Sequence, residues 1–248
     1  MLKRDGVFYH IHCKEGDVGR YVLLPGDPFR TDKIAEYLDN PVLVAHNREH
    51  KTWTGFLNGE KVSVTSTGMG CPSAAIALEE LIACGADTFI RVGTSGRVSE
   101  KSQNPDLTGV IITAAVRDEG TTRQYIPIEY PAVADRHIVG ALADAAKKLN
   151  LNFDEGITHS KDSFYSQVFT DTVPSKNRIH DRIEAWKAGN VMCSEMESAA
   201  LFVISSIRNV RAGGIMAFSD IEDQASAVDK AIRTACEGIK LLIERDKS

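Results

Sequence analysis

Three arginines in the sequence stand at positions where a protein could hold a small anion. Arg30 follows the turn that Gly26 begins, and Arg91 ends an otherwise apolar segment, with the hydroxyl of Thr94 three residues later. Glycine lets backbone N–H groups converge on an anion, and arginine adds a forked cation, a combination that suits phosphate. Because a lone buried guanidinium is costly, Arg91 must either pair with a core carboxylate or face a ligand. Arg30 and Arg48, taken alone, are more typical of solvated surface positions.

Two glutamates, Glu195 and Glu197, flank Met196 directly before a long apolar segment. In extended backbone, side chains two residues apart point to the same side. Paired carboxylates can bind the vicinal hydroxyls of a sugar, or stabilise positive charge that develops on it. The alternative is a solvated helix amino terminus, where the helix dipole favours acidic residues. The residues by themselves leave both interpretations open.

The glycine-rich segment 67–73 is similar to the start of a dinucleotide-binding fingerprint. Ser73 stands where the third glycine belongs and Pro72 is awkward in that turn, so the segment indicates close backbone approach to some ligand rather than NAD. His46 and His50 are four residues apart but lack the H-E-x-x-H order. A zinc site is therefore not expected.

The composition is that of a globular protein, and residues 1–248 are interpreted as a single domain with a large core. The net charge of −5 disfavours a nucleic-acid partner, because contacts to phosphate backbones need a basic face. No segment approaches the roughly 20 apolar residues of a membrane span, so no membrane partner is expected. The five cysteines form no C-x-x-C pair, which favours free thiols in a reducing cytoplasm.

Alternating strand and helix patterns predict the framework that positions these residues. Strands are expected at 21–25, 53–57, 62–67, 88–92, 110–116 and 215–218, and helices at 31–38, 72–84, 135–149, 196–207 and 229–244. Asn58-Gly59 predicts a tight hairpin between the second and third strands. The alternation favours an α/β fold, a single-domain three-layer α/β/α sandwich with a central mixed sheet. In such folds ligands bind beyond the carboxyl ends of the strands.

Four segments together resemble the nucleoside phosphorylase-I family, over nearly the whole chain. They are LPGDP at 24–28, TGMG at 67–70, RVGT at 91–94 and EME at 195–197. Three further segments are most similar to the bacterial uridine phosphorylases: NGEK at 58–61, EYPAVAD at 129–135 and KDSFY at 161–165. The resemblance implies a phosphorylase-type fold and a pentosyltransferase. It also implies a dimer-based homohexamer whose subunits share active sites.

The resemblance further implies roles for individual residues. Phosphate would be held by Gly26, Arg30, Arg91, Thr94 and, from the neighbouring subunit, Arg48. Ribose would be held by Met196 and Glu197, with His10 reaching across the dimer to the 5′-hydroxyl, and the paired-carboxylate interpretation adds Glu195. Glu49 and Ser73 match positions that hold a monovalent cation, K⁺ or Na⁺, between subunits in some members. No other cofactor is implied, since phosphate is a co-substrate.

The segments expected to contact the base give conflicting indications of whether it is a pyrimidine or a purine. Phe164 and Gln167 match base-binding positions of the uridine members, but the arginine that usually follows is absent from 168–173. A second arginine expected after the last strand is also missing. Ser219-Asp220 stands there instead and resembles the purine nucleoside phosphorylases, whose aspartate protonates or hydrogen-bonds the purine at N7.

The favoured prediction is the reversible phosphorolysis of uridine to uracil and ribose 1-phosphate, with Arg91, Glu197 and Asp220 as catalytic residues. One alternative is a purine nucleoside phosphorylase with Asp220 as acid, which requires burial to raise the pKa of that carboxyl. A nucleosidase is a second alternative, and the three phosphate arginines argue against it. A non-catalytic nucleoside-binding protein is a third, and the intact acidic segment argues against it.

Overall fold

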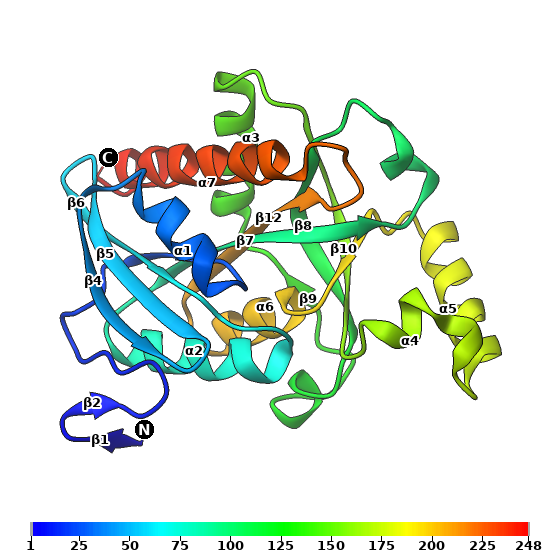
Figure 1. Cartoon of the computed structure of the whole chain (residues 1–248), viewed down its shortest axis with the longest axis horizontal. Coiled ribbons are helices and arrows are strands. Elements are labelled where there is room, and N and C mark those ends of the chain that lie inside the picture. The colour runs from blue at the N-terminus through cyan, green and yellow to red at the C-terminus, as the bar shows by residue number, and fades with distance from the viewer. Residues whose placement is uncertain (1, 248) are drawn as a thin grey trace.

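The computed structural model describes residues 2–247, and its centre is a ten-stranded sheet (Figure 1). The strands run in the order β11-β10-β8-β12-β7-β3-β6-β5-β4, with β9 paired to β8, and β1 and β2 form a separate small ribbon. The strands are β1 Lys3–Arg4, β2 Val7–Phe8, β3 Tyr21–Leu24, β4 Asp39–Asn47, β5 His50–Leu57, β6 Glu60–Thr65, β7 Thr88–Arg97, β8 Gly109–Asp118, β9 Ala132–Val133, β10 Phe153–Lys161, β11 Cys193–Glu195 and β12 Arg211–Phe218.

The large sheet is mixed and partly closed on itself. Strand β3 is parallel to β6 and β7, and β7 is parallel to β12, whereas β12 and β8 are antiparallel. Strand β11 is parallel to β10 on one side and antiparallel to β7 on the other, so β7, β12, β8, β10 and β11 form a ring. This closure places the end of β7 beside the short strand that carries Glu195, with Gly96 opposite Ser194.

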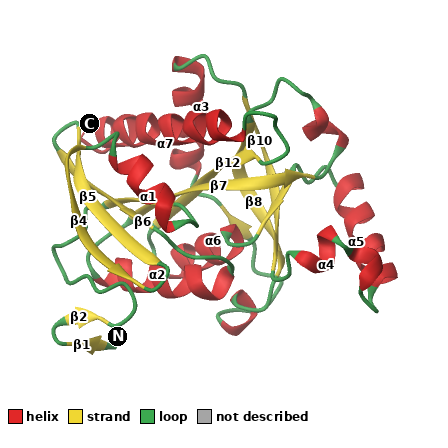
Figure 2. Cartoon of the chain, viewed as in Figure 1, coloured by secondary structure: helices red, strands yellow, loops and turns green. Residues whose placement is uncertain are grey.

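Helices cover both faces of the sheet, and α4 and α5 lie at one end (Figure 2). Helices α1, α3 and α7 bury their apolar side chains on one face, and α2 and α6 on the other. The helices are α1 Pro28–Ala35, α2 Cys71–Ala83, α3 Arg136–Lys148, α4 Tyr165–Val168, α5 Lys176–Ala188, α6 Ser198–Ile207 and α7 Gln224–Lys247, with 3₁₀ turns at Glu100–Gln103, Thr122–Gln124 and Thr170–Thr172. The predicted three-layer α/β/α sandwich with a mixed sheet is confirmed.

Turn and cap residues place several elements where the sequence predicts them. Asn58 and Gly59 both have positive φ, 48° and 77°, and join β5 to β6 in the predicted hairpin. The Asp135 carboxylate accepts the first free N–H groups of α3 and so fixes the start of that helix. The helix expected at 31–38 begins earlier, because Pro28 fits the first turn and Asp27 caps it.

Three of the longer elements have no expected counterpart, and one strand is longer than predicted. Strands β4 and β10 are rich in exposed or half-buried residues, and α5 has no buried residue, so none carries a clear apolar period. Strand β7 continues past Val92 to Arg97, because β12 pairs with it as far as Ser95 and β11 pairs with Gly96 and Arg97. The predicted free thiols are confirmed, since all five cysteines are buried and unpaired. Within residues 2–247, no helix has the length and apolar character needed to span a membrane.

Candidate active site

A cavity of about 900 Å³, which we call the main cavity, opens at the carboxyl ends of β3, β6, β7, β11 and β12. This is the edge at which α/β folds bind ligands. Its lining brings together most of the site residues that the sequence predicts: Gly26, Arg30, Glu49, Ser73, Arg91, Thr94, Phe164, Glu195, Met196 and Glu197. His10, Arg48, Gln167 and Asp220 are not among the lining residues.

Arg91 is buried on β7, and both possibilities raised for it apply at once. Its Nε donates to Glu195 Oε2 at 3.2 Å, and its Nη2 donates to Glu197 Oε2. Its other terminal nitrogen, Nη1, is buried and has no hydrogen-bond partner among the described residues. A buried donor of this kind is costly unless a ligand satisfies it. Arg91 is therefore paired with core carboxylates and still has one donor for an anion.

Gly26 and Arg30 lie on the turn from β3 into α1, which the Asp27 carboxylate caps. The Arg30 guanidinium extends toward β7 and donates to the carbonyl of Val92 at 3.3 Å. Burial, followed by the charge of Arg91, lowers the pKa of Arg30. Because the two guanidinium groups repel each other, an anion placed between them would stabilise both. The arrangement fits phosphate.

Glu195 is held by the protein on both carboxylate oxygens. Its Oε1 accepts the hydroxyl of Ser160 at 2.5 Å. Its Oε2 accepts Arg91 and the backbone N–H groups of Glu197 and Ser198, at 2.8 and 2.9 Å. Those N–H groups lie at the amino terminus of α6, so Glu195 has the helix-terminus role that was the alternative to sugar binding.

Glu197 is also buried but differs in its surroundings. Its Oε1 accepts the backbone N–H of Gly70 at 2.6 Å, and its Oε2 accepts Arg91. Gly70 has φ of 89°, a conformation that favours glycine. Burial raises the pKa of Glu197, and the charge of Arg91 opposes that rise. With two protein donors rather than four, Glu197 retains acceptor sites for the hydroxyl groups of a ligand.

Helix α4 forms one wall of the main cavity with Phe164 and Val168, which are both about half exposed. Gln167, expected to contact a base, does not line the main cavity and instead lines a different one. Successive positions on a helix are about 100° apart, so the neighbouring side chains of Gln167 and Val168 line different cavities. The sequence spacing alone does not reveal this division.

Asp220, the acid proposed for a purine base, lies outside the main cavity. Its carboxylate is exposed and pairs with Arg97 at 3.2 Å. The Arg97 guanidinium is fixed in turn over the ring of Phe218, at 3.9 Å from the ring centroid. The neighbouring Ser219 does line the cavity. The structure thus pairs Asp220 with Arg97 and leaves its carboxylate exposed.

The comparison with known proteins identifies the architecture around this cavity. The phosphorylase superfamily matches residues 20–244. The chain belongs to the phosphorylase superfamily. A uridine phosphorylase of Treponema pallidum is 46% identical over 250 residues, 96% of this chain and 95% of that protein. A guanosine phosphorylase of Halorubrum lacusprofundi is 37% identical over 206 residues, 83% of this chain and 80% of that protein. The crystal structure of a uridine phosphorylase from Vibrio fischeri has a TM-score of 0.85 and 28% identity, and the alignment covers 98% of this chain and all of that one.

In this phosphorylase chain, the two residues expected to serve a neighbouring subunit lie away from the main cavity of their own subunit. The backbone N–H and the Nδ1 of His10 contact the Glu80 carboxylate, with Nδ1 2.7 Å from Oε1. Arg48 has φ of 54°, and its guanidinium lies 5.8 Å from the ring centroid of Tyr9. Their roles across a subunit boundary stay predictions.

Glu49 and Ser73, the residues predicted to hold a monovalent cation, are adjacent at the rim of the main cavity. The Ser73 hydroxyl is 2.9 Å from Glu49 Oε1. Gly68 packs against both side chains, since a Cβ there would lie 2.7 Å from each. One subunit thus supplies two oxygen groups, whereas no group of three or more His, Cys, Asp or Glu side chains among residues 2–247 could hold a metal ion.

Three residues that the sequence analysis did not assign contribute to the site of this phosphorylase. Ser160 anchors Glu195 and lies on β10, a strand whose polar sequence concealed it. The buried hydroxyl of Ser95 has no hydrogen-bond partner among residues 2–247 and lines the main cavity beside Thr94. Lys161 lines the main cavity from the end of β10. A polar residue at the carboxyl end of a strand is the signal that could have found Ser95.

Proposed function

We propose that the protein catalyses the reversible phosphorolysis of uridine, which gives uracil and ribose 1-phosphate in nucleoside salvage. The observation that carries this proposal is the buried, unpartnered nitrogen of Arg91 in a cavity that also contains Arg30. A nucleosidase uses water and has no need of two guanidinium groups in its cavity. Relatives named uridine phosphorylase that align over almost their whole length support the same reaction.

Phosphate binds between the turn after β3 and the second half of β7. Arg30 and Arg91 supply cationic donors, and Gly26 and Thr94 add a backbone N–H and a hydroxyl at the same edge. The guanidinium groups stay protonated throughout, so they act by position and charge rather than by proton transfer. The bound dianion then lies where its oxygen can attack the sugar at C1′.

Ribose binds beside Met196 and Glu197, above the phosphate. As the glycosidic bond breaks, positive charge develops on the sugar, and the Glu197 carboxylate and the phosphate dianion both stabilise it. Glu197 also accepts hydrogen bonds from the sugar hydroxyls. Glu195 acts through its neighbours, because it fixes Arg91 and the first turn of α6. It is a positioning residue and does not touch the sugar.

The base lies between the aromatic wall of α4 and the polar end of β7. Phe164 offers a ring face, and the unpartnered hydroxyl of Ser95 offers a donor for a uracil oxygen, whereas the Ser219 hydroxyl already donates to the Ser95 carbonyl at 3.1 Å. Because Asp220 is paired with Arg97 outside the cavity, it does not protonate a base in this arrangement. This favours the pyrimidine reaction over the purine alternative.

The decisive experiment follows base release from uridine, inosine and guanosine, with and without phosphate. The proposal requires uracil release that depends on phosphate and yields ribose 1-phosphate. Phosphate-independent release would identify a nucleosidase, and faster release from inosine or guanosine would identify a purine enzyme. Binding without turnover of any nucleoside would identify a non-catalytic binding protein. Each of those three outcomes contradicts the proposal.

The complete site is proposed to contain residues of two subunits in a dimer-based homohexamer. Arg48 would add a phosphate ligand from the neighbouring subunit, and His10 would reach the 5′-hydroxyl of its nucleoside. Light scattering measures the mass of the assembly in solution. A monomeric mass at micromolar concentration would contradict the proposed hexamer. Co-expression of Arg30→Gln and Arg48→Gln subunits tests sharing, because mixed dimers would regain sites that neither variant forms alone.

Two further expectations belong to the same proposal. Glu49 and Ser73 would contribute oxygens to K⁺ or Na⁺ held between subunits, in keeping with the preference of such ions for oxygen ligands. Replacing K⁺ and Na⁺ by a bulky organic cation should then lower the thermal midpoint of the assembly, and an unchanged midpoint would exclude the site. The five free thiols support a cytoplasmic location, which fractionation of the source cell would test.

A further inference from the structure

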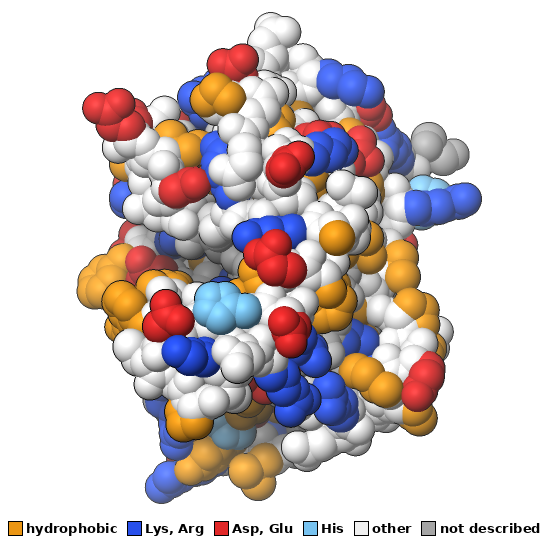
Figure 3. Space-filling model, turned by 90° about the vertical axis from the view of Figure 1, so that its right-hand side faces the viewer, with side chains coloured by type: hydrophobic (Ala, Val, Ile, Leu, Met, Phe, Trp, Pro, Cys, Tyr) orange, Lys and Arg blue, Asp and Glu red, His pale blue; other side chains and the backbone are white. Residues whose placement is uncertain are grey.

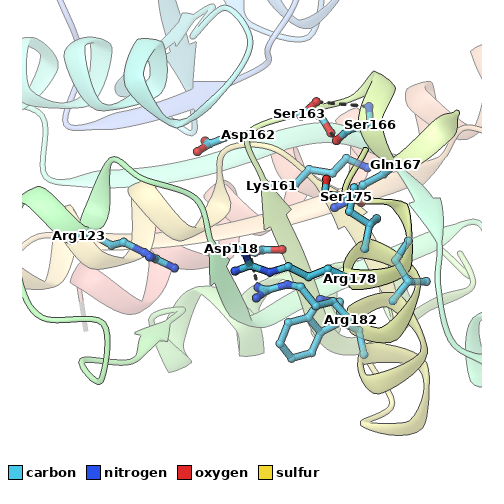
Figure 4. Close-up of a pocket in the computed structure, with 13 residues that line it drawn as sticks. Asp118, Arg123, Lys161, Asp162, Ser163, Ser166, Gln167, Ser175, Arg178 and Arg182 are labelled. Atoms are coloured by element: carbon cyan, nitrogen blue, oxygen red, sulfur yellow. Dashed lines mark hydrogen bonds and ion pairs between the residues drawn. The ribbon is translucent and has the colours of Figure 1, made fainter. Parts of the chain in front are cut away.

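A second cavity, of about 290 Å³, lies behind α4, between the ends of β8 and β10 and helix α5 (Figure 4). Helix α4 and the residue before it separate this second cavity from the main cavity. Phe164 and Val168 line the main cavity, whereas Ser163, Ser166 and Gln167 line the second one. The segment 163–168, which contains α4, therefore presents apolar side chains to the nucleoside site and polar ones to a neighbouring cavity.

The second cavity contains more cationic than anionic side chains. Arg123, Lys161, Arg178 and Arg182 line it, together with Asp118 and Asp162. Both carboxylates are already used by the protein. Asp118 contacts Arg182 at 2.5 Å and His159 at 2.9 Å, and Asp162 accepts the backbone N–H of Gly120 at 2.9 Å.

Arg123 and Arg178 have no such partners. Neither makes a hydrogen bond or ion pair with any other residue in the range 2–247. In Figure 4, Arg123 extends from one side of the cavity, and Arg178 extends beside Arg182 from α5 on the other. Lys161 lies deeper, and burial lowers its pKa, as expected for an ammonium group held out of water. Seen from the end that carries α5, lysine and arginine side chains are interspersed with acidic ones (Figure 3). The unpaired arginines of this cavity are thus available to a doubly charged anion.

The remaining wall is apolar and comes from α5. Ile179, Ile183 and Trp186 line it, and the Trp186 ring lies 5.5 Å from the Arg182 guanidinium. A volume of about 290 Å³ is close to the lower limit of roughly 300 Å³ for small-molecule sites. An anion-binding end next to an indole and two isoleucines suits a ligand with a phosphate at one end and a flat ring at the other.

We propose that the second cavity binds a phosphate monoester of the nucleoside monophosphate class, with its phosphate between Arg123 and Arg178 and its base against Trp186. Because α4 is shared, occupancy of this site shifts Phe164 and alters the affinity of the main cavity for its nucleoside. The binding stands on the geometry alone. Only the coupling rests on the proposed function.

Trp186 provides a local signal for the test. The chain has two tryptophans, so Trp53→Phe leaves Trp186 as the single indole emitter. Uridine 5′-monophosphate should produce a saturable change in Trp186 emission, and uridine without phosphate should not. Arg123→Gln and Arg178→Gln should each weaken binding about tenfold, as expected for loss of a charge-assisted hydrogen bond. Lys187→Gln removes an exposed charge from α5, the helix that carries Arg178, and should leave binding unaltered.

The controls separate the two cavities. Arg30→Gln removes an arginine of the main cavity and should leave the Trp186 response intact. The proposal is overturned if Arg30→Gln abolishes the response, if uridine alone reproduces it, or if the Arg123→Gln, Arg178→Gln double variant binds as tightly as the parent. Calorimetric titration of protein with both tryptophans gives the same comparison should Trp53→Phe fail to fold.

The coupling is measured separately from binding. Addition of uridine 5′-monophosphate should change the KM for uridine in the parent enzyme but not in the Arg123→Gln, Arg178→Gln variant. An equal change in both would place the nucleotide in the main cavity and overturn the coupling. If uridine is not turned over at all while the Trp186 response persists, the proposed function fails and the second site stands.

Discussion

Arg91 and Glu197 form a buried ion pair in the main cavity, and Arg91 still has a terminal nitrogen without a protein partner. The pair joins the two halves of the proposed site, because one partner faces the anion and the other faces the sugar. Neither side chain can leave without stranding a buried charge. The geometry therefore couples phosphate binding to the position of the group that contacts ribose.

Arg30 is expected to act mainly on phosphate. Replacement by Gln removes a charged donor, so the KM for phosphate should rise about 10- to 100-fold, while the KM for uridine changes much less. Steady-state kinetics with each substrate varied in turn measures both constants. Lys33→Gln makes the same charge change on the exposed side of α1 and should have little effect. A rise in the uridine KM alone would assign Arg30 to the nucleoside.

Glu195 is expected to matter for folding. Glu195→Gln would turn a donor toward groups that are themselves donors, which should lower the free energy of unfolding by about 2–4 kcal/mol. Urea denaturation measures the change, and Glu222→Gln, at an exposed position, serves as the control. A Glu195→Gln protein that is fully stable but binds nucleoside poorly would instead support direct contact with ribose.

Asp220 is expected to be dispensable for uridine. Asp220→Asn removes the exposed partner of Arg97, which keeps its backbone carbonyl partners. The free energy of unfolding should therefore change by about 1 kcal/mol or less, and kcat/KM for uridine should stay within about threefold of the parent. Parallel assays with inosine provide the contrast. Selective loss of inosine turnover in this variant would restore Asp220 as the acid of a purine reaction.

Gly68 is expected to tolerate no side chain. Its φ is 69°, and a Cβ would lie 2.7 Å from Glu49 Cγ and from Ser73 Oγ. Gly68→Ala should therefore lower the free energy of unfolding by about 1–3 kcal/mol and reduce activity. Gly59→Ala has a similar φ of 77° but open space, so it reports the backbone strain alone. Equal losses of stability in the two variants would show that the contact with Glu49 and Ser73 contributes nothing.

Asp246, in the last turn of α7, is expected to contribute an acid-sensitive part of the stability. A hydrogen bond from Arg211 is the largest cause that lowers its pKa from 3.8 to about 2. A depressed pKa favours the folded state above about pH 4, and this contribution is lost as the pH falls through about 2. Between these two pH values, the free energy of unfolding of the parent should therefore fall by about 1 kcal/mol more than that of Asp246→Asn. Asp181→Asn, which removes an exposed carboxylate of α5, should retain the slope of the parent.

Local chemistry made much of the fold predictable. The hairpin at Asn58-Gly59, the cap at Asp135 and the apolar strands β3 and β8 each follow from residues that prefer one backbone conformation or one buried position. Strand β4, strand β10 and helix α5 do not follow from such local preferences, because many of their side chains are exposed or half-buried and show no apolar period. These elements form through pairing and docking with distant parts of the chain.

The sequence by itself determined which residues carry the proposed chemistry. A buried arginine, a glycine turn and an acidic segment are each stable in only a few environments, and binding an anion or a sugar is one of them. Only the tertiary structure decided how they divide the work. The ring closed by β11 brings Arg91 to both glutamates and leaves Glu195 saturated, whereas Glu197 stays open. The cavity that Gln167 lines, and the largely buried arginine that pairs with Asp220, depend on contacts between residues far apart in sequence. No local pattern encodes such contacts.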